Sequence, residues 1–183
     1  CIRDSVCVVN SFRSKLLHKK MTFVFLSDEN YRGYFSDEEW AVCRRHVPWT
    51  RKVREGRTTY REQPVNLLEH ILQHQHDLVL KPNDDYGGKG VTIGWEASRE
   101  QWETALAGAL NDSYVVQERV PVCRQPYPLY EGGLVFTDLA ADLDPFLFGT
   151  EVTGMLTRLS AAALLNVTAG TGSTVPAFVI EEE

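Results

Sequence analysis

The sequence predicts an α+β protein that combines antiparallel strands with helices. Short apolar segments rich in Val, Ile, Phe and Tyr recur along the chain between turn residues, as expected of strands. Two capping boxes, Ser36 with Glu39 and Ser98 with Gln101, mark the starts of two helices. From Leu134 onward the segments are mainly strand-like. A mixed chain with a strand-rich, antiparallel C-terminal part follows from these three observations.

The elements are expected in a definite order along the chain. Helices are expected at 14–28, 36–46, 64–76 and 98–110. Strands are expected at 6–9, 47–53, 77–82, 91–95, 114–120, 144–148, 151–160, 163–168 and 175–181. The segments 60–64 and 123–133 are expected to be loops because they combine Pro, Gly and polar residues.

Composition and charge limit the classes of function. The 183 residues suffice for one domain or two small lobes, and no apolar run is long enough to span a membrane, so a membrane partner is not expected. The four cysteines are scattered without a C-x-x-C pair, which argues against zinc and predicts reduced thiols in a cytoplasmic protein. The chain starts at Cys1 without an initiator Met, so we expect a fragment of a longer protein.

The charge is distributed unevenly along the chain. Residues 1–61 contain 13 Lys and Arg against 7 Asp and Glu, whereas the remainder contains 6 against 18. A basic first third could contact nucleic acid, an anionic small molecule or the acidic part of the same chain. Nucleic acid is the least supported of these because no basic ladder interleaved with aromatic residues is present.

The segment 81–91 places three glycines and two lysines directly after an apolar strand. It is not a Walker A loop, because Lys89 is followed by Gly90 instead of Ser or Thr. It is not a Rossmann fingerprint either, because a strand follows it where a helix is required. A third arrangement fits: Lys81 projects from a strand toward phosphate, and a flexible glycine lid covers the phosphates. The alternative is an ordinary hairpin turn.

Six segments carry a resemblance to a known family, in the order in which they follow one another along the chain: 9–20, 46–53, 78–91, 114–120, 142–160 and 164–173. Taken together, they resemble the ATP-grasp superfamily. The resemblance extends over nearly the whole chain, and the chain looks similar in particular to uncharacterised bacterial proteins grouped with circularly permuted ATP-grasp and glutathionylspermidine-synthase-like sequences. It implies two lobes with antiparallel sheets and flanking helices around a nucleotide cleft.

The resemblance assigns site residues by position. ATP would be bound by Lys19 (or its neighbour Lys20), Lys81, Gly87, Gly88, Lys89, Gly90, Gln117, Glu118 and Val120. Magnesium would be bound by Asp142 and Asn166, and Arg158 would stabilise the transferring phosphoryl group. Leu164 and Leu165 stand where the family usually has a glutamate, and Asp144 could replace that carboxylate. We expect Asp84 and Asp85 to lie at the base of the lid, in solvent or in salt bridges.

The expected segments are therefore 1–63 before the nucleotide lobe, 64–121 as the glycine-lid lobe and 122–183 as the metal-binding lobe. The resemblance implies a carboxylate–amine or carboxylate–thiol ligase that uses ATP and Mg²⁺, acts through an acyl-phosphate, and takes a small-molecule or peptide carboxylate. One alternative is a catalytically inactive nucleotide-binding or interaction module; another is a nucleic-acid-binding domain that uses the basic first third. His70 and His74 are expected to be exposed polar residues, and Trp95 and Trp102 packing residues.

Overall fold

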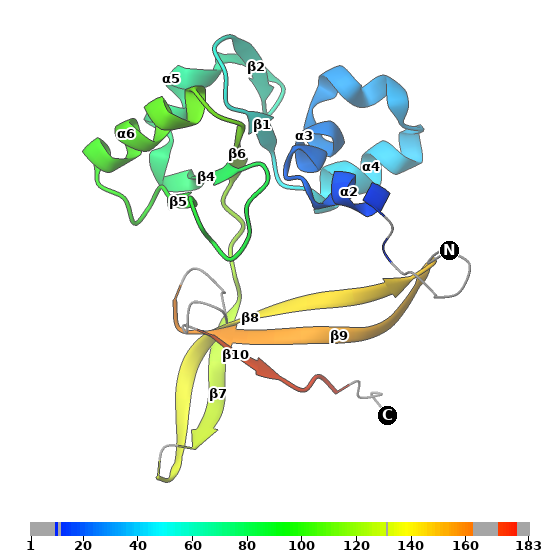
Figure 1. Ribbon diagram of the computed structural model, residues 1–183, viewed down its shortest axis with the longest axis vertical. Coiled ribbons are helices and arrows are strands. Elements are labelled where there is room, and N and C mark those ends of the chain that lie inside the picture. Colours follow the sequence, from blue (N-terminus) through cyan, green and yellow to red (C-terminus); the bar gives the residue numbers. More distant parts are fainter. Residues whose placement is uncertain (1–9, 11, 131, 163–171, 179–183) are drawn as a thin grey trace. The chain divides into compact units, whose positions relative to one another are not determined.

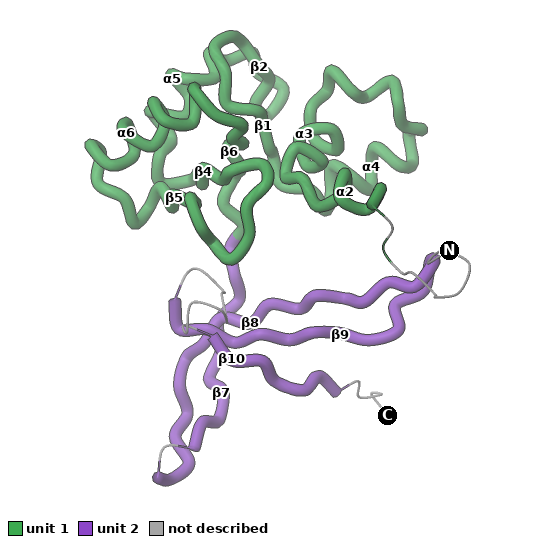
Figure 2. Tube along the Cα trace, viewed as in Figure 1, with its two compact units in different colours: residues 1–120 green, residues 121–183 purple. Residues whose placement is uncertain are grey.

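The computed structural model describes residues 10, 12–130, 132–162 and 172–178, and it confirms an α+β chain with antiparallel sheets (Figure 1). The chain divides into two compact units, Cys1–Val120 and Pro121–Glu183, and each is described by itself (Figure 2). Among the described residues, no helix has both the length and the apolar character that a membrane crossing requires.

The first unit begins with a group of short helices. Their bounds are η1 Phe12–Ser14, α2 Lys15–His18, α3 Met21–Ser27, η2 Glu29–Tyr34 and α4 Asp37–His46. The capping box predicted for α4 is confirmed: the Ser36 hydroxyl accepts from the Glu39 amide, and the Glu39 carboxylate accepts from the Ser36 amide. The second predicted box, at Ser98 and Gln101, caps α6 in the same way.

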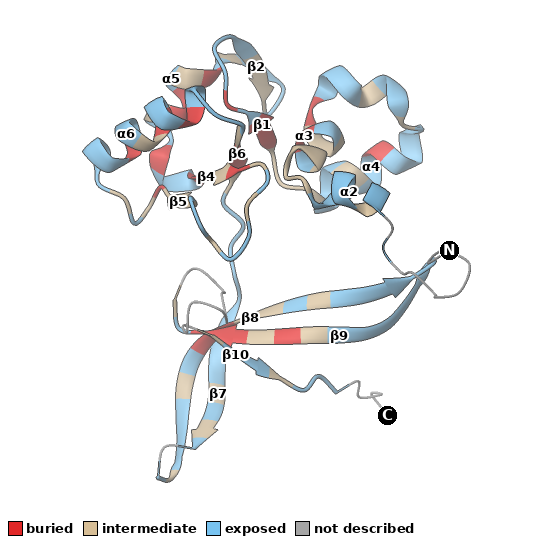
Figure 3. Cartoon of the chain, viewed as in Figure 1, coloured by how far each residue is buried: buried red, intermediate tan, exposed pale blue. Residues whose placement is uncertain are grey.

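A four-stranded antiparallel sheet forms the centre of this unit, in the order β1-β6-β4-β5. Its strands are β1 Thr50–Lys52, β6 Tyr114–Glu118, β4 Leu78–Pro82 and β5 Thr92–Ile93. The core lies between the sheet and helices α5 (Leu67–Gln73) and α6 (Arg99–Leu110), as the buried residues in Figure 3 show. The core residues are Val53, Leu67, Ile71, Leu78, Leu80, Trp102, Leu106, Ala109 and Val116.

The alternation of the strands separates core residues from candidate site residues. Leu80 of β4 pairs with Val116 of β6, and both belong to the core. The neighbouring residues Lys81 and Gln117 project from the opposite face, because successive side chains of a strand point to opposite sides. The sheet therefore packs its apolar side on α5 and α6 and carries Lys81 and Gln117 on its other side.

Two expectations about the segment before α5 are wrong. Residues 57–66 form a hairpin of β2 (Arg57–Tyr60) and β3 (Gln63–Asn66), and Pro64 lies in β3 opposite Thr59. Arg61 and Glu62 form its two-residue turn with φ of 47° and 67°, without the Gly or Asn that usually marks such turns in a sequence. The helix therefore begins at Leu67, where the Asn66 side chain accepts from the amides of Leu68 and Glu69.

Gly94 allows the chain after β5 to pack tightly against the segment before β4. A Cβ at Gly94 would lie 1.8 Å from the Gln75 carbonyl oxygen, so this position has room for a hydrogen only. The buried Gln75 amide in turn donates to the carbonyls of Gly94 and Ala97, at 3.0 and 2.8 Å.

The second unit is an antiparallel sheet in the order β10-β9-β8-β7, as far as the described residues go. Its strands are β7 Arg124–Tyr130, β8 Leu134–Phe148, β9 Glu151–Ser160 and β10 Gly172–Val175. The predicted strand at 151–160 is confirmed. The expected strands at 6–9 and 163–168 lie outside the described residues, as do residues 179–181 of the strand expected at 175–181. Of the described part of that segment only Val175 is in a strand, at the end of β10, and residues 176–178 are not.

The loop predicted at 123–133 is also wrong, since most of it is β7. This strand pairs with β8 from Arg124 opposite Ala140 to Tyr130 opposite Leu134. Pro126 and Pro128 suggested a loop, but β7 is the edge strand of its sheet. Two prolines spaced by two residues direct their missing N–H positions to the same, unpaired side, which an edge strand tolerates.

Candidate functional site

Lys81 is held at the end of β4 by a chain of side-chain hydrogen bonds. Its ammonium group donates to Gln117 Oε1 at 2.7 Å, and Gln117 Nε2 donates to Thr50 Oγ1 at 2.9 Å. Thr50 Oγ1 donates in turn to the Pro48 carbonyl at 2.9 Å. Three neighbouring strands thus fix the position of one half-buried cation, and two predicted site residues, Lys81 and Gln117, come into contact.

A second ammonium group, that of Lys20, lies near Lys81. Lys20 Nζ donates to the Asp85 carbonyl at 2.6 Å, and its backbone amide donates to the Asn83 carbonyl at 3.1 Å. Burial, and then the positive charge of Lys20, lower the pKa of Lys81 below its ordinary value. Burial also lowers the pKa of Lys20, against the opposing effect of Asp85. Two partly desolvated cations that repel each other are a favourable environment for an anion.

Lys19, the lysine predicted to bind nucleotide, contacts Asp84 of the glycine loop. Asp84 Oδ1 lies 2.7 Å from Lys15 Nζ, and Lys19 forms an ion pair with Oδ2 of the same carboxylate. Hydrogen bonds from Lys15 and then Lys19 lower the pKa of Asp84 to about 2. The expectation of salt bridges at the base of the loop is confirmed for Asp84. Lys20, and not Lys19, is the lysine that lies near Lys81.

Asp84→Asn should therefore remove a contribution to stability that depends on pH. The folded-state pKa of Asp84 is below its ordinary value, so its contribution is present above about pH 4 and lost as the pH falls toward about 2. We expect the melting temperature of the variant to lie below that of the wild type at pH 6, and the difference to vanish near pH 2. Asp85→Asn is the control, because the Asp85 carboxylate forms no ion pair with the described residues. A difference that stays constant from pH 6 to pH 2 would contradict this prediction.

The glycine loop after β4 is shaped by three residues in the left-handed region. Gly87, Gly88 and Gly90 have φ of 66°, 75° and 70°, which other residues rarely adopt. A Cβ on Gly90 would also lie 3.0 Å from Tyr114 Oη. The loop is partly closed on itself: the Lys89 amide donates to the Tyr86 carbonyl and the Val91 amide to that of Gly88. These two amides would have to be released before they could bind a phosphate.

The end of β6, predicted to receive adenine, is largely engaged in the fold. The Glu118 amide donates to the Trp49 carbonyl, and the next amide, that of Arg119, donates to the Asp77 carbonyl. The Glu118 carboxylate accepts from Tyr60 Oη at 2.8 Å and from Arg61 at 3.1 Å. The Glu118 side chain therefore links the end of β6 to the β2–β3 hairpin. Val120, just beyond the strand, is 58% exposed.

The hydrogen bond between Tyr60 and Glu118 should be visible in a tyrosine titration. Burial, and then the hydrogen bond to Glu118, raise the pKa of Tyr60 from 10.0 to about 12. Because the folded-state value is the higher one, the stability linked to it is complete below about pH 10 and is lost as the pH rises through about 12. In an absorbance titration of tyrosinate, we expect Tyr60→Phe to remove the component of highest pKa and Glu118→Gln to lower it. Tyr130→Phe, at an 83% exposed tyrosine, is the control. An unchanged high-pH component in Tyr60→Phe would contradict the assignment.

The expectation that His70 is exposed is wrong. Its side chain is buried against Trp49, Tyr60 and His74, with ring centroids 5.5, 4.4 and 4.4 Å away. The sequence spacing placed it beside the apolar stripe of α5, but the β2–β3 hairpin covers this side of the helix. His74 is exposed as expected, and Trp102 is fully buried in the core as expected.

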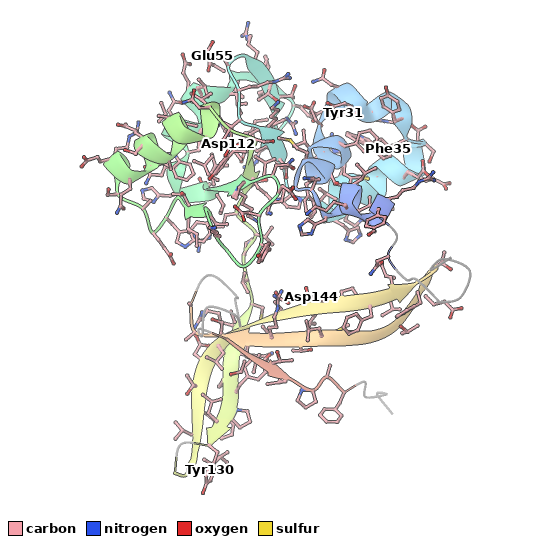
Figure 4. The ribbon with its side chains drawn as sticks, in the orientation of Figure 1. Tyr31, Phe35, Glu55, Asp112, Tyr130 and Asp144 are labelled. Carbon is pink, nitrogen blue, oxygen red and sulfur yellow. The ribbon has the colours of Figure 1, made fainter. Side chains whose placement is uncertain are left out.

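In the second unit, β8 and β9 bring three predicted site residues together. Asp142 lies opposite Arg158 in the ladder, and Asp144 lies two residues further along the same face of β8. Arg158 forms ion pairs with both carboxylates, with Asp144 Oδ2 2.9 Å from its guanidinium. Burial, and then the charge of Asp142, raise the pKa of Asp144. Asp144 carries a label in Figure 4.

These carboxylates fit a hard cation in their chemistry. Asp142 Oδ1 is buried without a hydrogen-bond partner, so it is a carboxylate oxygen that the fold leaves unsatisfied. Carboxylate oxygens are the ligands that Mg²⁺ prefers. Within the described part of the chain, no three His, Cys, Asp or Glu side chains form a metal-binding group. Asn166, the other predicted ligand, lies outside the described residues.

Two residues that help to build the site around Lys81 were not predicted. Thr50 connects Gln117 to the segment before β1 through its hydroxyl group. The side-chain oxygen of Asn83 accepts from the Met21 amide at 2.9 Å and so caps the start of α3. A Pro-Asn-Asp turn directly after a strand was the available signal for Asn83. Thr50 has no such signal, since its role depends on a strand pairing between distant segments.

No protein-family model matches this chain, and no curated protein matches it. Its function therefore has to be inferred from its own residues. The features that support such an inference are the two partly buried lysines, Lys20 and Lys81, the glycine loop that follows β4, and the Asp142–Asp144–Arg158 cluster of the second unit.

Proposed function

We propose that the chain is an ATP-grasp domain whose first unit binds the phosphates of ATP. The observation that carries the proposal is the state of Lys81: a half-buried ammonium with an amide oxygen as its partner, and no carboxylate within ion-pairing distance among the described residues. A buried cation without a counter-ion is costly unless something anionic binds to it. Phosphate oxygens beside Lys81 and Lys20 would restore the ordinary pKa of both.

The glycine loop supports the same assignment. It follows Lys81 directly, and its three positive φ angles allow backbone N–H groups to approach an anion closely. Adenine would be bound beyond the end of β6, at the backbone around Val120, since the amides of Glu118 and Arg119 already donate within the fold. Gln117 would act indirectly, by holding the Lys81 ammonium in place.

The first test is a calorimetric titration of the chain with ATP, ADP, AMP and adenosine. The proposal requires that affinity rise with the number of phosphates, because Lys20 and Lys81 would contact phosphate and not the base. Binding should also weaken as the salt concentration increases. Failure to bind ATP, or equal binding of ATP and adenosine, would rule the proposal out.

In the second unit, Asp142 and Asp144 would bind Mg²⁺. Their two carboxylates would be its ligands among the described residues. Magnesium, when bound, would supply the charge neutralisation that phosphoryl transfer requires. Arg158 would be released from at least one carboxylate and could then stabilise negative charge on a phosphoryl group. The combination supports a ligase that joins a small-molecule or peptide carboxylate to an amine or thiol.

We expect Asp142→Asn to reduce the enhancement of ATP binding by Mg²⁺ at least about tenfold, because it removes a charged ligand oxygen. The measurement is ATP affinity with and without Mg²⁺. Asp138→Asn is the matched control, since Asp138 also lies on β8 but pairs with Arg124. An Asp142→Asn protein that responds to Mg²⁺ like the wild type would exclude this role for Asp142.

One observation favours an inactive nucleotide-binding module as the second candidate. A single guanidinium, that of Arg158, already pairs with both carboxylates, which can replace a metal ion as their partner. Release of phosphate from ATP in the presence of amino acids and short peptides distinguishes the two candidates. A ligase requires phosphate release that depends on the acceptor, whereas a module binds ATP and releases none.

A further inference from the structure

The first unit contains a cavity of about 320 Å³ that lies away from Lys81 and the glycine loop. Residues of α3 and η2 form one side of it, and the β1–β2 connection forms the other. Figure 4 labels one residue from each side, Tyr31 and Glu55. Neither Lys81, Gln117 nor any glycine of the loop lines this cavity, so it is separate from the proposed nucleotide site.

The helical side of the cavity is mainly apolar and aromatic, and the polar residues Asp28 and Asn30 also line it. Met21, Val24, Phe25 and Tyr31 line it, together with Leu67 from α5. Phe25 and Tyr31 have ring centroids 5.3 Å apart and remain 39% and 38% exposed. Two tilted rings that are packed on each other and still exposed can accept a third ring against them.

The opposite side carries positive charge without counter-ions. Lys52, Arg54 and Arg57 line the cavity, are exposed, and have no side-chain hydrogen bond or ion pair with any described residue. Glu55 is the one carboxylate on the same connection, and Asp28, which lies 3.7 Å from Arg51, is the second carboxylate that lines the cavity. Arg51 also lines the cavity but is fully engaged, with Glu29 at 2.8 Å.

The backbone that carries these cations is anchored at both ends. The Val53 amide donates to the Tyr114 carbonyl at 3.0 Å, and the Gly56 carbonyl accepts from the Leu67 amide at 3.0 Å. The backbone positions of Arg54 and Arg57 are therefore set by the fold. Two guanidinium groups carried by such an anchored backbone are suited to bind the planar oxygens of a carboxylate or those of a phosphate.

We propose that this cavity binds a small aromatic anion, a molecule with one ring and one carboxylate or phosphate group. The ring would pack on Phe25 and Tyr31, and the anionic group would be bound by Arg54 and Arg57. The volume is at the lower end of the range for small-molecule sites, roughly 300–1,000 Å³, and suits a molecule with a single ring. This site is additional to the proposed ATP site and does not depend on it.

The test is a chemical-shift titration of the isotope-labelled chain with phenyl phosphate, phenylacetate and benzyl alcohol. We expect one or both anions to shift the amide signals of Phe25, Tyr31 and Gly56, and the neutral alcohol to bind at least about tenfold more weakly. The two anions together show whether the site prefers phosphate or carboxylate. Inorganic phosphate and acetate, which lack a ring, should bind more weakly than either.

Variants separate this site from the nucleotide site. The double substitution Arg54→Gln and Arg57→Gln should weaken anion binding at least about tenfold and leave ATP affinity unchanged, while Lys81→Met should leave anion binding unchanged. Arg45→Gln is the matched control, since Arg45 is exposed on α4 and does not line the cavity. Equal binding of benzyl alcohol and the anions, or no effect of the double substitution, would overturn the proposal. Shifts that cluster at Lys81 and Gln117 instead would also overturn it.

Discussion

Lys81→Met is expected to lower the affinity of the chain for ATP about 100-fold, which corresponds to about 3 kcal/mol. Methionine keeps most of the length of the side chain and removes the charge. The ammonium group of Lys81 is held by Gln117, next to Lys20 and before the glycine loop, so it is the cation best placed to contact phosphate. The measurement is a calorimetric titration with ATP.

The same substitution should not destabilise the fold appreciably. Burial and the repulsion from Lys20 lower the pKa of Lys81, which means that its charged form is disfavoured in the folded state. Removing the charge therefore offsets the loss of the hydrogen bond to Gln117, and we expect a melting temperature equal to or above that of the wild type. Arg45→Gln is the control: it changes the net charge by the same amount at an exposed position of α4, and it should leave ATP affinity unchanged. A Lys81→Met protein that binds ATP normally would remove the main support for the proposed function.

The pH dependence of ATP binding should report on the Lys81 ammonium group. Because the pKa of Lys81 lies below its ordinary value of 10.5, the cation loses its proton at a lower pH than an exposed lysine does. ATP affinity should consequently decrease on the alkaline side before ordinary lysines titrate, because the free chain loses the Lys81 proton at a lower pH than the complex, in which bound phosphate raises the pKa of Lys81. An apparent pKa that is higher for the complex than for the free chain is the expected signature.

Local signals in the sequence predicted those features of the fold that local chemistry determines. The capping boxes at Ser36 and Ser98 each satisfy backbone amides within one turn, so they mark helix starts whatever surrounds them. The strand that contains Lys81 was equally clear, because an apolar run at residues 78–80 directly precedes this lysine.

Features that depend on distant pairings were not predictable in this way. The prolines of β7 are acceptable only because this strand lies at the edge of its sheet, and the burial of His70 depends on a hairpin whose turn, Arg61-Glu62, has no usual turn residues. For the site, the sequence indicated Lys81 and Gln117 individually. It could not show that they contact each other or that Lys20 lies near them, since these contacts join residues from three separate segments.

Arg51→Met is expected to lower the free energy of unfolding by about 3–5 kcal/mol, the typical cost of breaking a buried ion pair from one side. Arg51 is 2% exposed, and its guanidinium donates to three carbonyls, two hydroxyls and the Glu29 carboxylate. Asp28, 6% exposed, lies 3.7 Å from it. Without Arg51, the Asp28 carboxylate and the three carbonyls would remain in place and lose the guanidinium group as a partner. Chemical denaturation measures the loss.

A second substitution tests this explanation. If the cost comes mainly from an unpaired buried carboxylate, then Asp28→Asn in the Arg51→Met background should recover part of the lost stability, although Asp28→Asn alone should be destabilising. Arg45→Met, at an exposed position of α4, should change stability by less than about 0.5 kcal/mol. A loss below about 1 kcal/mol in Arg51→Met would show that the buried cation contributes little.

Arg51 also connects the stability of the unit to the candidate site. Its guanidinium donates to the carbonyls of Ser27 and Thr50, and Thr50 Oγ1 accepts from Gln117, which holds Lys81. Loss of Arg51 should therefore weaken ATP binding even at temperatures where the variant remains folded. We expect this effect to be several-fold, smaller than that of Lys81→Met, because Arg51 would act on phosphate only through the position of Lys81. A folded Arg51→Met protein with unchanged ATP affinity would show that the hydrogen bonds from Gln117 and Thr50 position Lys81 without it.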